Sequence, residues 1–188
     1  IMLLLTFKAT VALGGAFMLL LITSKTDHDL EHAFSRVEWT TIFFFIGLFV
    51  VVSGLVETGI ISSLARSAIE FTGGDIKVTA ILILWLSAIA SAFVDNIPFV
   101  ATMIPMIQDM GTMGIANLEP LWWSLALGAC LGGNGSLIGA SANLIVAGLA
   151  AQEGTHISFM RFFAVGFPLM LLSVLVATVY VYIRYLMV

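Results

Sequence analysis

Long apolar runs separated by short polar segments organise the chain. Residues 1–22, residues 39–56 and a final run at about 162–184 each have the length and apolar character of a membrane-spanning helix, which needs about 20 residues. The polar segment 23–38 between the first two runs must lie in water. This pattern predicts an all-α, multi-pass integral membrane protein.

Segment 57–75 is amphipathic rather than uniformly apolar. At helical periodicity its apolar side chains fall largely on one face: Ile60, Ile61, Leu64, Ala68, Ile69 and Phe71. Its polar side chains fall largely on the other: Ser62, Ser63, Arg66, Ser67 and Glu70. Such a segment favours a helix that lies in the membrane interface. Gly73 and Gly74 predict its end.

The apolar run 78–107 does not fit a single straight helix. It would be about 45 Å long if wholly helical, which exceeds one span, yet it is shorter than two spans and a turn. Asp95–Asn96 and Pro98 break it, and proline suits the first turn of a new helix. We therefore predict a re-entrant hairpin with a first arm at 78–94, a tip at 95–97 and a second helix from Pro98.

A second long run, 121–151, is also interrupted. It follows the polar loop 108–120 and contains Gly132, Gly133, Asn134 and Gly135 in succession. Three glycines in four residues disfavour a continuous helix, and the piece before them, 121–131, would be only about 16 Å long. The pattern predicts a discontinuous helix with an unwound centre.

Interrupted membrane helices place backbone groups and helix ends at membrane depth, where transporters bind ions and substrates. Asp95 is the candidate ion ligand, for Na⁺ or H⁺, because an ionisable group inside a membrane is a functional-site hypothesis by default. We expect it beside the C-terminus of the first arm, where the helix end and partial burial both disfavour its charged form. The full set of candidate binding residues is Asp95, Asn96, Pro98, Thr102, Gly132, Gly133, Asn134, Gly135, Ser136, Ser141 and Asn143.

Structural roles are the alternative for each of these residues. Asp95 can cap a helix or pair with Lys8, and Asn96 can satisfy backbone groups at the tip. Small residues such as Gly128 and Gly139 permit close helix packing. Ser141 and Asn143 can bond to their own helix.

The amino-acid composition also indicates a membrane protein and excludes several functional classes. Hydrophobic residues make up 61% and charged residues 10% of the chain, against about 45–50% and 25% in soluble domains. The net charge of −4 offers no basic patch for nucleic acid, and the single cysteine, Cys130, excludes a disulfide framework. His28, His32 and His156 lie in polar segments and are expected to be solvated.

Four stretches resemble the C-terminal half of a transporter of the ion transporter superfamily, in the group that holds NhaD-type sodium/proton antiporters, arsenite-pump membrane proteins and the melanosomal P protein. They are VEWTTIFFFIGLFVVVSGLVETG (37–59), SAFVDNIPFVATMIPMI (91–107), LWWSLALGACLGGNGSLIGASAN (121–143) and ISFMRFFAVGFP (157–168). They cover most of the chain in order.

The resemblance implies one half of an inverted-repeat fold. Residues 1–75 would supply scaffold helices and the interfacial arm. Residues 76–188 would supply the transport part, with the hairpin at about 78–107, the broken helix at 121–151 and the final helix at 162–184. It also implies a missing N-terminal half as partner, a homodimer, and a cell (plasma or inner) membrane as the site of action. No cofactor is expected beyond Na⁺ or H⁺ as coupling ion.

Three functions compete on this reading. The first is a secondary active transporter of a small ion coupled to H⁺ or Na⁺ by alternating access, and Asp95 makes cation/proton antiport the favoured form. An anion permease, for arsenite or a small organic anion, is the alternative, although neither broken segment carries an arginine. An ion channel is the second hypothesis, and a non-transporting membrane scaffold or an intramembrane enzyme is the third. An enzyme is not expected, because membrane depth holds one aspartate and no histidine.

Overall fold

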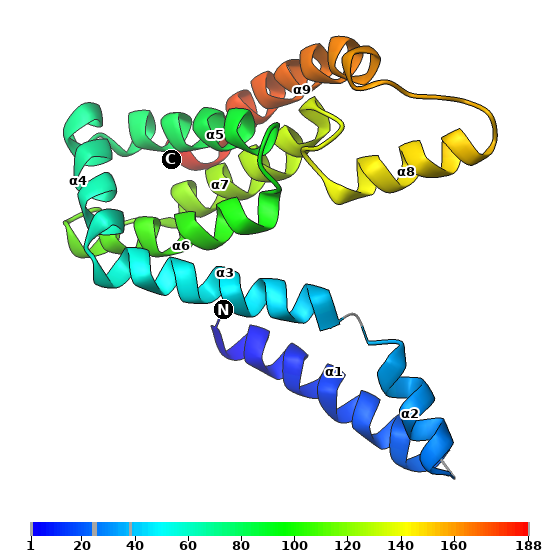
Figure 1. Cartoon of the computed structure of the whole chain (residues 1–188). Coiled ribbons are helices and arrows are strands. Elements are labelled where there is room, and N and C mark those ends of the chain that lie inside the picture. The colour runs from blue at the N-terminus through cyan, green and yellow to red at the C-terminus, as the bar shows by residue number, and fades with distance from the viewer. Residues whose placement is uncertain (1, 24–25, 38, 188) are drawn as a thin grey trace. The chain divides into compact units, whose positions relative to one another are not determined.

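The computed structural model describes the backbone of residues 2–23, 26–37 and 39–187, with side chains from Thr10 onward. All regular structure within these ranges is helical, which confirms the all-helical fold class. In chain order (Figure 1) the elements are α1 (Met2–Thr23), α2 (Asp27–Ser35), α3 (Trp39–Glu57), α4 (Ile60–Thr72), α5 (Ile76–Ser91), α6 (Asn96–Thr112), α7 (Glu119–Gly132), the 3₁₀ turn η1 (Gly133–Gly135), α8 (Ser141–Gln152), α9 (Phe159–Val181) and the π-helical turn η2 (Tyr182–Leu186).

The chain divides into two compact units, Ile1–Ile46 and Gly47–Val188, with the division inside α3. Two helical segments of the described part are long and apolar enough to cross a membrane, Trp39–Glu57 and Phe159–Leu186. Both match predicted spans. The functional boundary predicted between residues 75 and 76 is a different kind of division, and it stays a prediction.

The smaller unit contains a helix that the hydrophobic pattern missed. Within the polar segment, α2 begins at a capping box in which Asp29 N–H donates to Thr26 Oγ1 at 3.3 Å and Thr26 N–H donates to Asp29 Oδ2 at 3.0 Å. The sequence Thr26-Asp27-His28-Asp29 carries the signal, since a hydroxyl followed three residues later by a carboxylate satisfies two free N–H groups reciprocally.

In the larger unit, α7 packs against α5, α6 and α9. The closest approach joins α7 to α5, and two glycines make it possible. A Cβ at Gly128 would lie 2.4 Å from the carbonyl oxygen of Leu84, and one at Gly132 would lie 2.3 Å from that of Ala88. Only a residue without a side chain fits at either place, so the α5–α7 contact is between backbones.

Two apolar clusters form around this pair. One gathers buried side chains of α4, α5, α6, α7 and the end of α9, with Ile107, Met110 and Leu121 fully enclosed. The other joins α5 to α9 through Leu84, Ala88, Ala92, Met170, Val174 and Ala177. Tight packing therefore holds α5, α6, α7 and α9, whereas α8, beyond the second break, has no buried residue.

The first predicted interruption is present with shifted bounds. α5 ends at Ser91 rather than residue 94, and α6 begins at Asn96 rather than Pro98. The turn therefore occupies 92–95 instead of 95–97, because Asp95 caps α6 and Pro98 falls inside its first turn. The two helices run in opposite directions (Figure 1). Whether they form a re-entrant hairpin in a membrane stays a prediction.

The second interruption also lies within the predicted run. α7 ends at Gly132, η1 occupies Gly133–Gly135, and regular helix resumes only at Ser141. The unwound stretch is longer than the glycine cluster, since it continues through residues 136–140.

The amphipathic segment folds as α4, which packs on α6 and lies across the end of the α5–α6 pair where α5 begins (Figure 1). Ile61 and Ala65 are buried, while Ile60, Leu64 and Phe71 of the predicted apolar face are exposed. On the polar side, Ser62 donates a hydrogen bond to Asp109 Oδ2 of α6 at 2.5 Å. The interfacial position of α4 stays a prediction.

That position can be tested by thiol labelling of the whole chain in membranes, after replacement of the exposed Cys130 by serine. Single cysteines at Ser63 and Ser67, which are exposed on the polar side of α4, should react with a membrane-impermeant reagent, whereas a cysteine at the buried Ala65 should not. Protection at every position would mean that α4 lies within the bilayer.

The glycine contact predicts a sharp difference between two Gly→Ala substitutions. Gly132→Ala should destabilise the fold by about 1–3 kcal/mol, because its methyl group overlaps the backbone of α5. Gly148→Ala in α8 is the matched control. It meets nothing within 4 Å, so it should be neutral or stabilise by up to about 1 kcal/mol. Thermal unfolding in detergent measures both, and equal effects would contradict the backbone contact.

Candidate functional site

The two interruptions meet in space at the C-terminal end of α5. Ser136, in the unwound stretch, donates a hydrogen bond from Oγ to the carbonyl oxygen of Ala92, and Ser91 Oγ donates to the carbonyl oxygen of Ala129 at 2.7 Å. A Cβ at Gly139 would lie 2.9 Å from the carbonyl oxygen of Ser91. The end of α5 is thus fitted directly against the break between α7 and α8.

Side chains within the break satisfy the backbone groups that unwinding releases. Asn143 Nδ2 donates to the carbonyl oxygens of Gly133 at 2.9 Å and Ser136 at 3.0 Å. Ser136 Oγ also accepts from Gly139 N–H at 3.1 Å. Because free carbonyls are costly away from water, these bonds stabilise one specific unwound conformation.

The predicted residues Gly132, Gly133 and Gly135 are buried here, and each has a packing role. Gly132 lies against α5, Gly133 faces the carbonyl of Gly139, and a Cβ at Gly135 would meet both Ala92 and Met170 at 3.0 Å. Asn134, by contrast, presents an exposed side chain. The glycines therefore shape the break, and Asn134 remains accessible at it.

α8 starts from the break without a side-chain cap. Its N-cap residue is Ala140, and Ser141 is exposed in its first turn. An uncapped helix N-terminus carries partial positive charge and unpaired N–H groups. This end of α8 suits an anion or water.

Asp95 is the N-cap of α6, which corrects the predicted environment of this residue. Its Oδ1 accepts from Ile97 N–H at 3.0 Å, and the side chain is half-buried. The charge therefore lies at a helix N-terminus, not beside the C-terminus of the first arm, and that helix end stabilises negative charge. Within the described part of the chain, Asp95 makes no ion pair. The Lys8 side chain lies outside the described residues.

The other candidates on α6 are half-buried: Asn96, Pro98 and Thr102. Thr102 Oγ1 donates to the carbonyl oxygen of Phe99 at 2.8 Å, so it bonds to its own helix. Asn96 and Pro98 lie in the first turn beside Asp95. Asp95 follows Ala92 by three residues, so their Cα atoms lie no more than about 11 Å apart. Ala92 in turn accepts the hydrogen bond from Ser136 in the unwound stretch.

Two residues of the site were not predicted from the sequence, Ser91 and Ala92, and Gly139 was expected only to permit close packing. Nothing in an apolar helix marks its last turn as a contact surface, although the small side chains at Ala88, Ser91 and Ala92 permit close packing. An aromatic group adjoins them, in which Phe93 lies 6.2 Å from Phe163 and 6.4 Å from Phe167 between ring centroids.

No group of three or more His, Cys, Asp or Glu side chains in the described residues is arranged to hold a metal ion. A bound Na⁺ or H⁺ at Asp95 accordingly stays a prediction.

Comparison with known proteins gives a consistent set of relatives. The family model described as citrate transporter matches residues 1–128. An uncharacterized transporter of Mycobacterium tuberculosis is 44% identical over 177 residues, which is 93% of this chain and 41% of the relative. The P protein of Homo sapiens is 41% identical over 185 residues, which is 95% of this chain and 22% of the relative.

The 46 kDa membrane protein of Mycobacterium leprae is 38% identical over 183 residues, which is 96% of this chain and 42% of the relative. The chain therefore spans less than half the length of these relatives. No solved structure matches it.

The hydrogen bonds of Asn143 predict a cost for losing its amide. Asn143→Ala should destabilise the protein by about 1–3 kcal/mol, because two carbonyls lose their donor. Asn117→Ala removes one exposed bond, which Asn117 Oδ1 accepts from Glu119 N–H, and should cost less. Thermal unfolding of both variants in detergent makes the comparison. A larger loss for Asn117→Ala would mean that Asn143 does not hold the break together.

Proposed function

The chain belongs to the citrate transporter family of the ion transporter superfamily, and from this premise we propose that it forms part of a secondary active transporter that moves a small ion by alternating access, coupled to H⁺ or Na⁺. General transport across a membrane follows from the family. Cation/proton exchange at Asp95 is our more specific proposal, and it rests on the capped position of that carboxylate at the start of α6.

Three properties of Asp95 support a cation-exchange role. Its carboxylate caps a helix N-terminus, where it accepts a hydrogen bond from the free backbone N–H of Ile97. One oxygen, Oδ1, is engaged by Ile97 N–H, and Oδ2 has no hydrogen-bond partner in the described residues. A half-buried carboxylate with one open oxygen suits a small cation, and a proton competes with that cation for the same group.

The packing around the break supports alternating access. The end of α5 and the unwound stretch are joined by the Ser136–Ala92 hydrogen bond and by the close fit of Gly139. Interfaces packed this tightly move as a unit rather than deforming. The turn that ends in Asp95 and the start of α8 would therefore travel together when the transport part moves against its surroundings.

A second function has one observation in its favour. The uncapped N-terminus of α8 suits an anion, and the matching family is described as citrate transporter. A small organic anion or arsenite would then be the substrate, and Asp95 would hold the coupling cation. The lack of arginine in α5–α8 of the described chain weighs against a tightly held carboxylate.

The molecular setting of this activity is also a proposal. Relatives more than twice as long support a second half that completes the site, in an inverted repeat with this one. We propose a homodimer in the cell membrane, with segment 57–75 in the interface and residues 76–188 as the moving part.

Asp95→Asn is the decisive substitution. It keeps the shape and the Oδ1 acceptor for Ile97 N–H but cannot ionise, so proton-coupled exchange should be lost while folding is retained. The test reconstitutes the complete polypeptide in proteoliposomes and follows proton movement driven by a Na⁺ gradient, with counterflow as a second readout. Asp109→Asn is the matched control at the far end of α6, and it should leave exchange unchanged.

The outcomes separate the candidate functions. Wild-type exchange in Asp95→Asn would rule out the coupling role and leave the residue as a helix cap. Counterflow of a small carboxylate or arsenite, without Na⁺/H⁺ exchange in the wild type, would favour the anion permease. Flux that neither saturates nor shows counterflow would indicate a channel.

A further inference from the structure

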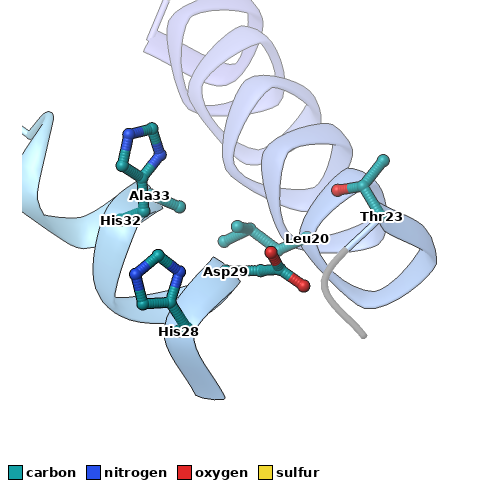
Figure 2. A pocket seen from close by; sticks show the side chains of 6 residues that line it. All are labelled: Leu20, Thr23, His28, Asp29, His32 and Ala33. Atoms are coloured by element: carbon teal, nitrogen blue, oxygen red, sulfur yellow. The ribbon is translucent and has the colours of Figure 1, made fainter. Parts of the chain in front are cut away.

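The helix between the first two apolar segments carries an imidazole pair that the proposed transport mechanism does not use. His28 and His32 lie on α2 one turn apart, and both are exposed. Residues separated by four positions share a helix face, with Cβ atoms about 5–6 Å apart. Figure 2 shows the two rings on the same side of α2, one beyond the other along the helix.

These rings border a pocket of about 330 Å³ that lies wholly within the smaller unit. Its lining comes from the end of α1 and from α2: Leu20, Thr23, His28, Asp29, His32 and Ala33. The pocket is therefore closed on one side by the last turn of α1, whose carbonyl end carries partial negative charge.

The local charge also favours a cation. Asp27, Asp29 and Glu31 alternate with the histidines along the same helix. Asp29 is engaged in the capping box through Oδ2, so it contributes field and fixes the start of the helix. That cap sets the orientation of the first turn, on which His28 lies.

We propose that His28 and His32 chelate a divalent transition metal ion, with Zn²⁺ as the representative case. Neutral imidazole is a preferred ligand of Zn²⁺, Ni²⁺ and Cu²⁺, and two histidines four apart on a helix form a recurrent half of zinc sites. Water completes the coordination, since the described residues offer no third ligating side chain in a group. The site is consequently of moderate affinity and exchangeable.

Residues 28–32 match the pattern His-x-x-Glu-His, but this match does not indicate a catalytic zinc site. Glu31 is not among the residues that line the pocket. A catalytic zinc site needs three protein ligands and an open position, which this pair does not supply.

The test is isothermal titration of ZnCl₂ into the complete protein, purified without a polyhistidine tag. The wild type should show saturable Zn²⁺ binding. His28→Ala and His32→Ala should each weaken it by at least about tenfold, since even the loss of a residue that only orients a ligand costs about 10–100-fold in affinity. The chain has three histidines, so His156→Ala is the matched control and should bind as the wild type does.

A spacing variant separates chelation from simple histidine content. Combining His32→Ala with Ala33→His keeps two histidines but places them five apart, on different faces of α2. It should bind as weakly as His28→Ala, with helicity by circular dichroism unchanged. Equal Zn²⁺ affinity in the spacing variant and the wild type would overturn the proposal, and so would the absence of saturable binding in the wild type. Neither result bears on transport at Asp95.

Discussion

The direct contact between the backbones of α5 and α7 is the constraint on which the rest of the larger unit depends. Gly128 and Gly132 allow the carbonyl groups of Leu84 and Ala88 to approach where any side chain would collide. Dispersion and close packing, rather than burial from water, hold helices together within a membrane. Because α5 and α7 stay in contact along their length, the C-terminal end of α5 lies at the point where α7 unwinds.

The contact between α5 and α7 also buries polar groups that lack hydrogen-bond partners in the described part of the chain. Ser87 and Ser124 are fully buried, on α5 and α7, and neither hydroxyl has a hydrogen-bond partner among the described residues. Each such group costs about 1–3 kcal/mol. The hydroxyls at Ser91 and Ser136, next to the break, both donate hydrogen bonds to carbonyl oxygens. The buried serine hydroxyls next to the break are thus hydrogen-bonded within the described residues, whereas Ser87 and Ser124, between the regular helices, are not.

The hydrophobic pattern predicted the two helices that are long and apolar enough to span a membrane, the two interruptions and the amphipathic helix, because each depends on the length and periodicity of local sequence. That residues 1–22 also span the membrane stays a prediction. The pattern missed α2, although Thr26 and Asp29 carried a capping-box signal, because a short polar helix has no apolar stripe. The predicted surroundings of Asp95 were wrong, because α6 begins at Asn96, two residues before Pro98, and Asp95 is therefore its N-cap. The contacts of Ser91 and Ala92 could not be predicted, because they arise only when α5 and the break meet. Close packing was among the roles expected of Gly139, although its partner was not.

The two helix N-termini of the site are electrostatically unlike, and this difference shapes what the site can bind. α6 starts at a carboxylate that caps its positive end, so an ionised Asp95 would outweigh the roughly +0.5 charge of that helix end. α8 starts at Ala140 with nothing to offset its positive end. A cation at Asp95 would make the start of α6 positive. In the anion-permease hypothesis, that charge would favour an anion at α8 if the two helix ends share one site. In the antiport hypothesis, water can satisfy the free N–H groups at the start of α8, and the exchange of cation and proton at Asp95 needs no anion. The family description favours an anion, and the lone carboxylate favours a cation. If both ends belong to one transport site, cation binding at the first would make anion binding at the second less costly, and the two indications would then be compatible.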